Sequence, residues 1–247
     1  QLTNDHSQLT TDDGPLTTAP MPHRPANTHP ASLRIIGGTL RGRKLEYGGQ
    51  PRTRPMKDRV REAVFNLLGP HLAGKLAVDL FAGTGALGLE ALSRGATRAL
   101  FFEQHFPTAE LIRRNARTLG VESQVEVVAA DTFIRFRRTV DLATSADPDL
   151  GWVVFCSPPF EFYARRRDDM LALVGTLLSA APPQSQFVVE ADDRFDFSLL
   201  PQAAAWLVRE YPPARVGIWP RLGIGIGGEP GGPNAQETSI APIVRFQ

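Results

Sequence analysis

From Leu76 onward, the apolar residues follow two alternating patterns, one typical of buried strands and one typical of amphipathic helices. Short apolar runs bounded by turn residues predict buried strands, and the stretches between them carry apolar side chains at the spacing of amphipathic helices. Strands are predicted at Leu76–Leu80, Arg98–Phe102, Val125–Ala129, Trp152–Cys156 and Gln186–Glu190, with later candidates at Ala205–Glu210 and Arg215–Trp219. Helices are predicted at Ala86–Arg94, Pro107–Leu119, Thr132–Arg138 and Arg165–Ala180. Because strands and helices alternate across short loops, the sequence predicts an α/β fold with a doubly wound, mainly parallel sheet.

The segments that flank this region follow other patterns. Residues 1–32 contain almost no large apolar side chains, so they cannot bury enough surface to offset the entropy of ordering, and we expect a disordered tail. The segment Arg34–Leu68 favours a short hairpin, with Gly37-Gly38 as a turn or bulge, and then an amphipathic helix after Pro55. We therefore divide the chain into a disordered tail (1–32), a small N-terminal hairpin-plus-helix extension (33–70), an α/β domain (71–222) and a flexible Gly/Pro-rich tail (223–247).

Composition excludes several classes of protein. At 247 residues the chain can hold one sizeable α/β domain with extensions, but not two full ones. Its single cysteine, Cys156, excludes an internal disulfide framework and a cysteine-built metal site, and the five histidines support no metal site either. No apolar run approaches the roughly 20 residues of a membrane span, and the N-terminus lacks the apolar core of a signal peptide. We therefore expect a cytoplasmic protein that binds neither metal nor membrane. We also expect a monomer, although the composition does not determine the oligomeric state.

Charge is unevenly distributed along the chain. The net charge is +1 overall, but the segment Arg34–Arg61 holds nine basic residues against two acidic ones. A solvated charged surface is one explanation of this segment. Its arginines, however, are interleaved with glycines that keep the backbone accessible, a combination that favours contact with nucleic acid.

A glycine-rich motif follows the first predicted strand. The hexapeptide from Gly83 to Gly88 satisfies G-x-G-x-x-G, and Glu103 lies 20 residues after Gly83, an arrangement that is typical of a dinucleotide site. Asp79, near the end of that strand, argues against a pyrophosphate, because a carboxylate at close range in a partly dry site would repel it. S-adenosylmethionine has an ammonium and a sulfonium but no phosphate. The motif therefore favours this methyl donor, with Glu103 accepting from the ribose hydroxyls and Asp131 placed near the adenine.

The fourth predicted strand ends in the tetrapeptide from Ser157 to Phe160, SPPF. Taken alone, it is an ordinary Pro-Pro turn. At this strand end it resembles the [DNS]-P-P-[YFW] motif of amino-methyltransferases. Acceptors at Ser157 and at the Pro158 carbonyl can pull on the N–H bonds of an exocyclic amine and turn its lone pair towards the methyl group. Phe160 can stack on a base that has been taken out of its helix.

Four segments together carry a more specific resemblance. The four segments are RIIGGTLRGRKL, RPMKDRVREAVFNLL, DLFAGTGALGLEALSRGA and the SPPF turn. Their order and spacing are similar to those of the RsmD family of bacterial 16S ribosomal RNA guanine-N2 methyltransferases. The similarity covers residues 34–220 and implies a class I Rossmann-like methyltransferase fold with S-adenosylmethionine as the donor. It also implies a guanine N2 acceptor in small-subunit rRNA or in the assembling 30S particle.

Each site residue is carried over from that family by its position in the motifs. The resemblance assigns the cofactor to Asp79, Phe81, Gly83, Gly85, Glu103 and Asp131; the target base to Ser157, Pro158, Pro159 and Phe160; and RNA to Arg34, Arg41, Arg43, Arg54 and Arg59.

The sequence departs from the family pattern at two positions, which keeps alternatives open. The family turn normally begins with Asp where this chain has Ser157, and the family RPT is here Arg54-Pro55-Met56. A ribosome-binding or assembly protein that has lost catalysis is therefore an alternative to the enzyme. An oxidoreductase would use the same glycine loop and Glu103, but it leaves Asp79 and the SPPF turn unexplained.

Overall fold

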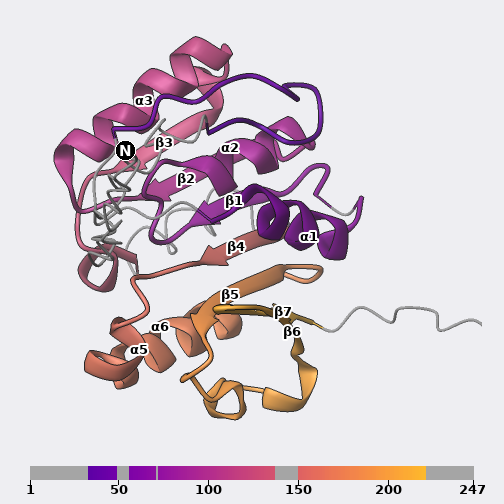
Figure 1. Cartoon of the computed structure of the whole chain (residues 1–247), viewed down its shortest axis with the longest axis vertical. Helices are drawn as coiled ribbons and strands as arrows, with labels where there is room; N and C mark the ends of the chain where they lie inside the picture. Colours follow the sequence, from indigo (N-terminus) through magenta and orange to yellow (C-terminus); the bar gives the residue numbers. More distant parts are fainter. Residues whose placement is uncertain (1–32, 49–55, 71, 137–149, 221–247) are drawn as a thin grey trace, which may run out of the picture. The chain divides into compact units, whose positions relative to one another are not determined.

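The computed structural model describes residues 33–48, 56–70, 72–136 and 150–220 (Figure 1). The predicted tails, residues 1–32 and 223–247, lie outside the described residues, as does Arg54. The helices are α1 (Asp58–Leu68), α2 (Ala86–Ser93), α3 (Phe106–Leu119), α5 (Phe162–Arg165) and α6 (Arg167–Ala180), and residues 132–136 are also helical. The strands are β1 (Leu76–Asp79), β2 (Arg98–Phe102), β3 (Val125–Val128), β4 (Trp152–Cys156), β5 (Gln186–Asp192), β6 (Leu207–Tyr211) and β7 (Ala214–Trp219).

The seven strands form one sheet in the order β3-β2-β1-β4-β5-β7-β6 (Figure 1). The first five strands of this order are parallel, whereas β7 runs antiparallel to both β5 and β6. The predicted doubly wound, mainly parallel sheet is thus confirmed. Because the chain builds outward from β1 in one direction and then from β4 in the other, the switch point lies between these two strands, where such sheets bind ligands.

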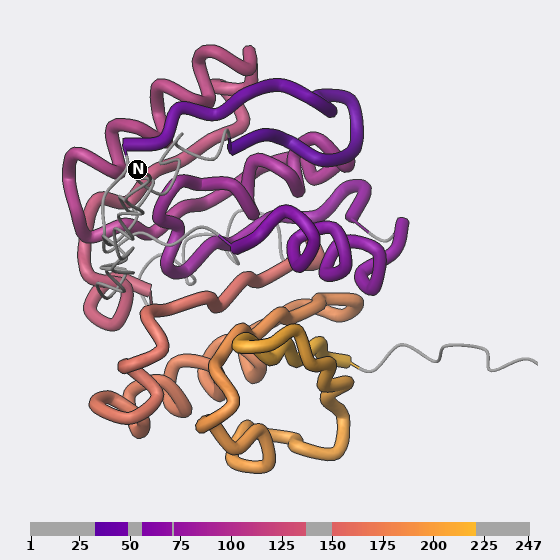
Figure 2. Tube along the Cα trace, in the orientation of Figure 1, coloured from indigo at the N-terminus to yellow at the C-terminus, as the bar shows by residue number. Residues whose placement is uncertain are grey.

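Helices cover both faces of the sheet, as the trace in Figure 2 shows. On one face, α1, α2 and α3 pack against the sheet in a core that includes Ala77 and Phe101. On the other face, α6 and the helical residues 132–136 pack against the alternate strand residues, among them Leu76 and Val78. This alternation follows from the two-residue period of a strand and explains why β1 and β4 are apolar throughout, apart from Asp79.

The structure differs from the predicted elements in two places. The helix predicted at Arg165–Ala180 is observed as α6 (Arg167–Ala180), but the short helix α5 (Phe162–Arg165) before it was not predicted. The two helices are separated at Arg166, which has a non-helical backbone with φ −133° and ψ 35°. No Gly or Pro marks this break in the sequence; the guanidinium of Arg166 contacts Asp169 in α6 and also residues after β3, described below.

Within the described ranges, no helix has both the length and the apolar character needed to cross a membrane.

The N-terminal segment, residues 33–48, is a looser hairpin than predicted. A single antiparallel bridge joins Arg34 and Lys44 in the described residues, and the chain reverses at residues 39–42, directly after the bend at Gly37-Gly38. Gly38 has φ +75°, and a Cβ at this residue would lie 1.9 Å from the backbone oxygen of Ser93. These glycines therefore allow close packing on α2, and Gly38 also begins the reversal, because its backbone oxygen accepts from the Arg41 N–H at 3.3 Å.

Candidate active site

Four polar residues lie at the carboxyl ends of neighbouring parallel strands. Asp79 ends β1, Glu103 follows β2, Asp131 follows β3 and Ser157 follows β4. Since these strands are adjacent in the order β3-β2-β1-β4, the four residues share one edge of the sheet. This edge is where open α/β sheets bind their ligands.

The Asp79 carboxylate is buried beside the first turn of α2 and is 1% exposed. Its Oδ2 accepts a hydrogen bond from the backbone N–H of Gly88 at 3.2 Å, while its Oδ1 is buried without a partner among the described residues. Burial raises the pKa of this carboxyl to about 7, the charge of Glu103 adds a smaller rise, and the Gly88 N–H opposes both. A buried acceptor without a donor is costly, and a bound cationic group would remove that cost.

Glu103 ties the glycine loop to the end of β2. Its Oε2 accepts from the backbone N–H of Gly83 at 2.9 Å, and its Oε1 accepts from the backbone N–H of His105 at 2.8 Å. Burial raises the pKa of the Glu103 carboxyl, and these two N–H groups oppose that rise. Each carboxylate oxygen has a second lone pair, so Glu103 can still accept from the hydroxyls of a ribose.

The glycine loop itself needs backbone conformations that favour glycine. Gly83 has φ 51° and Gly85 has φ 76°, and Gly85 directly precedes α2. A Cβ on Gly85 would also come within 3.0 Å of the Ile112 side chain on α3. The loop can therefore turn sharply into α2 while it packs closely against α3.

Asp131 caps the helical residues that follow β3. Its Oδ1 accepts from the backbone N–H of Phe133 at 2.8 Å, and its Oδ2 lies 3.5 Å from a guanidinium nitrogen of Arg166. The same guanidinium lies over the ring of Phe133, with its central carbon 3.7 Å from the ring centre. Arg166 thus joins the segment after β3 to the segment after β4.

Three phenylalanine rings meet at this edge of the sheet. The ring of Phe81, which follows β1, lies 5.7 Å from that of Phe133 and 6.0 Å from that of Phe162, and the last two are 6.0 Å apart. All three are partly exposed. A cluster of partly exposed rings beside polar groups can stack on a planar base.

The SPPF turn presents two oxygen acceptors. The hydroxyl of Ser157 donates a hydrogen bond to Oε2 of Glu190 in β5, which leaves lone pairs on the hydroxyl oxygen. The Pro159 carbonyl accepts from the backbone N–H of Phe162 at 2.9 Å, whereas no hydrogen bond among the described residues uses the Pro158 carbonyl. Phe160 is partly exposed. These groups are the ones that the sequence assigns to a substrate amine and its base.

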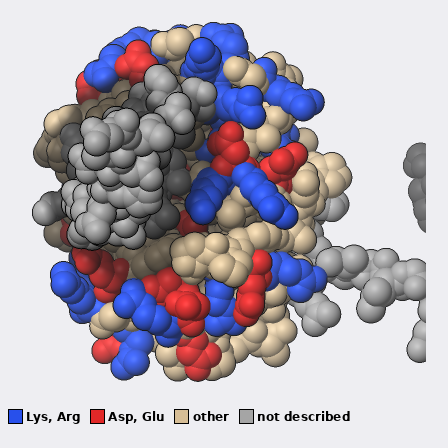
Figure 3. Space-filling view, in the orientation of Figure 1, with Lys and Arg blue, Asp and Glu red and all other residues tan. Residues whose placement is uncertain are grey.

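The predicted RNA contacts that fall on described residues lie in the 33–48 segment and in α1. Arg34, Arg41, Arg43 and Arg59 are all exposed. Two of them also have partners within the chain: Arg43 donates to the Thr118 backbone oxygen at 2.6 Å, and Arg34 lies 3.4 Å from the Asp58 carboxylate. In Figure 3, Lys and Arg side chains are numerous in the upper part of this face, with some Asp and Glu side chains among them, and both signs also alternate in the lower part, where Figure 1 shows α5 and α6.

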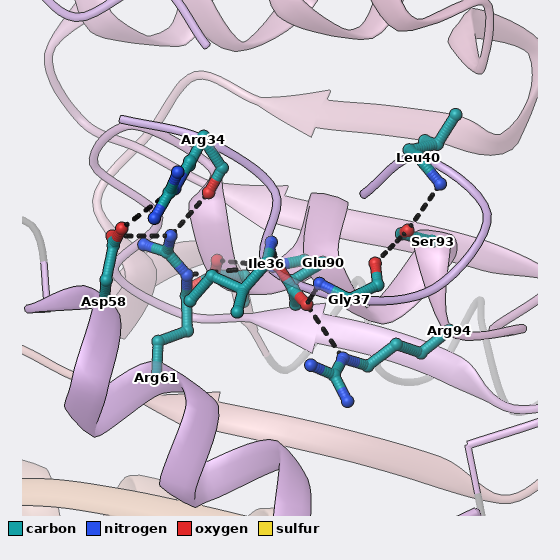
Figure 4. Close-up of polar contacts among 11 residues, drawn as sticks. Arg34, Ile36, Gly37, Leu40, Asp58, Arg61, Glu90, Ser93 and Arg94 are labelled. Carbon is teal, nitrogen blue, oxygen red and sulfur yellow. Dashed lines mark hydrogen bonds and ion pairs between the residues drawn. The ribbon is translucent and has the colours of Figure 1, made fainter. Parts of the chain in front are cut away.

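The 33–48 segment is anchored to the far end of the helix that begins at the glycine loop (Figure 4). The buried Glu90 carboxylate accepts from the backbone N–H groups of Ile36 and Gly37, each at 2.7 Å, and from Arg94 at 2.8 Å. Arg61 of α1, also fully buried, lies 4.0 Å from the same carboxylate. One short helix therefore carries the candidate cofactor loop at its start and holds the basic segment at its end.

Several residues of this edge were missed by the sequence-based prediction. Phe133, Phe162 and Arg166 come together only because the segments after β3 and β4 meet in space. Glu190 was predicted as the last residue of the fifth strand, but no contact with Ser157 was predicted. If the fourth and fifth strands are taken as parallel neighbours, their ends, and so these two residues, should lie close together. The pairing of Glu190 with Ser157 still depends on the register of β4 and β5.

Comparisons with known proteins agree with this architecture. A family model described as "Conserved hypothetical protein 95" matches residues 33–207. The Ribosomal RNA small subunit methyltransferase D of Escherichia coli K12 is 45% identical over 137 residues, which cover 56% of this chain and 65% of that protein. The chain thus matches slightly less than two thirds of the length of this relative.

Solved structures resemble the chain over more of its length. A hypothetical protein of Thermus thermophilus has a TM-score of 0.59 at 26% identity, covering 76% of this chain and 98% of that protein. The 16S rRNA N2 G1207 methyltransferase RsmC of T. thermophilus, solved with AdoMet and guanosine, has a TM-score of 0.55 at 17% identity, covering 77% of this chain and 50% of that one. At that identity the likeness concerns the fold, which is the class I methyltransferase fold that the sequence predicted.

Proposed function

The chain belongs to the RsmD family, described as conserved hypothetical protein 95, and we propose that it is an S-adenosylmethionine-dependent rRNA methyltransferase. Its acceptor is the exocyclic N2 amine of a guanine in small-subunit (16S) rRNA, free or within the assembling 30S particle. The name of the E. coli relative supports the rRNA substrate, and the family resemblance supports the guanine N2 specificity. Such a reaction belongs to the cytoplasm, where ribosomes are assembled.

The observation that carries the cofactor assignment is the buried Asp79 carboxylate, whose Oδ1 has no hydrogen-bond partner in the described part of the chain. A group with an ammonium fits this acceptor, whereas a pyrophosphate would be repelled by it. Glu103 would hold the ribose, Asp131 would lie near the adenine, and Gly83 and Gly85 would allow the backbone to approach the methionine part. When bound, S-adenosylmethionine supplies an electrophilic methyl group on a sulfonium.

The chain's own residues would orient the acceptor. The Ser157 hydroxyl oxygen and the Pro158 carbonyl oxygen, which accepts no hydrogen bond from the described residues, would each accept one N–H bond of the amine. This would turn the nitrogen lone pair away from the ring. The rings of Phe160 and Phe162 would stack on the base and exclude water from it. The exposed arginines of the 33–48 segment would bind phosphates and position the RNA without reading its sequence.

One observation favours a second candidate, an rRNA-binding assembly protein with weakened catalysis. Ser157 replaces the family Asp, and hydrogen bonds to an ionised acceptor are roughly twice as strong as neutral ones. The loss of transition-state stabilisation should be about 1–2 kcal/mol, or roughly tenfold to thirtyfold in rate. We therefore propose a slow enzyme rather than an inactive one.

Single-turnover methyl transfer to small-subunit rRNA distinguishes these functions. The wild type should transfer methyl, Ser157→Ala should be slower, and Ser157→Asp should be at least as fast with little change in cofactor affinity. An inactive wild type that Ser157→Asp restores would identify the binding protein. If all three chains react equally fast, Ser157 does not contact the amine. Calorimetric titration with S-adenosylmethionine and with NAD, in the same preparation, would test the cofactor separately.

A further inference from the structure

Glu190 lies directly beside the SPPF turn, although 33 residues separate it from Ser157. In the sheet, Cys156 of β4 is paired with Val189 of β5, so the next residue on each strand is also adjacent. The Ser157 hydroxyl donates to the Glu190 Oε2. Glu190 is 8% exposed, and its backbone oxygen accepts from the Tyr163 hydroxyl at 3.0 Å. Glu190 is therefore a buried residue of an inner strand, with its carboxylate hydrogen-bonded to Ser157 at the edge of the sheet where the reaction is proposed to occur.

We propose that Glu190 is a positioning residue that acts through Ser157 and makes this hydroxyl an effective proton acceptor for the substrate amine. The inference rests on the proposed amino-methyl transfer and adds to it a carboxylate that the SPPF turn itself lacks. A serine whose proton is already donated to a carboxylate has only lone pairs left to offer, so its oxygen can accept from an N–H bond. The charge-assisted bond to Glu190 also polarises the hydroxyl and makes its oxygen a stronger acceptor.

The proton balance of the reaction requires such an acceptor. The lone pair of the amine nitrogen forms the bond to the methyl carbon while the methyl–sulfur bond breaks, and the electron pair of that bond goes to sulfur. The nitrogen then carries one proton too many. That proton passes to Oγ of Ser157 as the serine proton passes to Oε2 of Glu190, which becomes a neutral carboxylic acid and later returns its proton to water.

Charge is conserved locally in this scheme. The sulfonium loses its positive charge and Glu190 loses its negative charge, so no net charge is created in a partly buried site. This matters because an uncompensated charge in such surroundings is costly. The carboxylate that the family pattern has within the turn is here reached through the Ser157 hydroxyl.

Single-turnover rates at saturating S-adenosylmethionine and RNA test this inference in the full chain. Ser157→Ala and Glu190→Gln should each lower the rate about tenfold or more, because proton transfer by a positioned group contributes at least that much. The double variant should be no slower than Ser157→Ala alone, since both residues act on the same proton. Affinity for S-adenosylmethionine should not change in Glu190→Gln. The matched control is Glu126→Gln, an exposed glutamate on β3, which should behave as the wild type.

The Ser157→Asp background separates this role from a structural one. With a carboxylate at residue 157 the amine has a direct acceptor, so adding Glu190→Gln should no longer lower the rate. A structural role would make Glu190→Gln equally harmful in both backgrounds, and that result would overturn the inference. Effects of Ser157→Ala and Glu190→Gln that multiply in the double variant would overturn it as well.

A second variant keeps the test valid if Glu190→Gln does not fold. Glu190→Asp keeps the charge but withdraws the carboxylate by one methylene, so it should react more slowly with unchanged affinity for S-adenosylmethionine; a wild-type rate would contradict the inference. An inactive wild type that still binds S-adenosylmethionine would overturn the proposed function, and this inference with it. An active wild type with unaffected Glu190 variants overturns the inference alone.

Discussion

The carboxylate of Glu103 accepts a hydrogen bond from the backbone N–H of Gly83 at 2.9 Å, and so joins the end of β2 to the glycine loop after β1. The side chain assigned to the cofactor ribose therefore also fixes the loop on which the methionine part would lie. Glu103 is thus assigned to the ribose and also anchors the glycine loop, and its other carboxylate oxygen accepts a hydrogen bond from the backbone N–H of His105.

Replacing Glu103 should consequently weaken cofactor binding through both contacts. We expect Glu103→Ala to lower the affinity for S-adenosylmethionine by roughly 1.5–3 kcal/mol, because hydrogen bonds to a charged group are lost. Glu103→Gln should be intermediate, since its amide oxygen can still accept from Gly83. Calorimetry measures the effect, with Glu110→Ala, an exposed glutamate on α3, as the control. Unchanged affinity in Glu103→Ala would show that the ribose is held elsewhere.

Asp79 should stabilise the cofactor complex at a cost to the free protein. Burial raises its pKa from 3.8 to about 7, so the folded chain binds a proton at Asp79 more tightly than the unfolded chain does. The contribution of the protonated Asp79 to the free energy of unfolding is therefore complete below pH 4 and is lost as the pH rises to 7. Asp79→Asn cannot ionise, so we expect it to be more stable than the wild type at pH 8 by at most about 4 kcal/mol. Urea denaturation at pH 8 and at pH 5 tests this, and the difference should shrink at pH 5.

Cofactor affinity should depend on pH for the same reason. A cationic ligand beside Asp79 favours the carboxylate, so below pH 7 binding must release the proton that Asp79 holds. We expect the affinity for S-adenosylmethionine to fall by up to about tenfold per pH unit below 7, which corresponds to the release of one proton. Calorimetry in two buffers of different ionisation enthalpy measures that release directly. Asp79→Asn should bind more weakly at pH 8 and release no proton; equal proton release in the variant would refute the assignment.

The basic segment makes a prediction about RNA. Arg41 and Arg43 are exposed, and replacing both by Ala should remove up to two phosphate contacts. The slope of log affinity for rRNA against log salt should then decrease by roughly 1.4–1.8, because fewer counterions are released. Cofactor affinity should not change. Arg98→Ala with Arg209→Ala is the matched control, as these arginines are also exposed but lie on β2 and β6. An equal decrease in the control would mean that net charge alone explains the effect.

Glu90 should be needed for stability rather than for chemistry. Its buried carboxylate accepts two backbone N–H groups of the 33–48 segment and balances the buried Arg61 (Figure 4). Glu90→Ala leaves both N–H groups and Arg94 without their buried acceptor, and leaves Arg61 with only the half-exposed Asp58 as a counterion, which should cost about 3–5 kcal/mol of unfolding free energy. Denaturant titration measures the loss. Glu62→Ala, an exposed position on α1, should change stability little; similar losses in both variants would contradict the role given to Glu90.

Much of the fold follows from the sequence because each β–α unit has its own periodicity and turn residues. Examples are the strands at residues 76–79, 98–102 and 152–156 and the helix α2, which follows the glycine loop. The order of the strand ends was enough to predict that Asp79, Glu103 and Ser157 lie at one edge of the sheet. The break at Arg166 carries no Gly or Pro signal, and two contacts of its guanidinium, with Asp131 and Phe133, come from another segment. The partner of Ser157 was also missed, because a contact across two strands depends on register.

The central claim is methyl transfer to a guanine N2 of small-subunit rRNA, and the methylated nucleoside tests it most directly. The full chain is incubated with labelled S-adenosylmethionine and with small-subunit rRNA or 30S particles from cells that lack the enzyme, and large-subunit rRNA serves as the control. Digestion and mass spectrometry should then show N2-methylguanosine at one position of the small-subunit rRNA and none in the control. Label on another base or another atom, or no label although S-adenosylmethionine binds, would contradict the account.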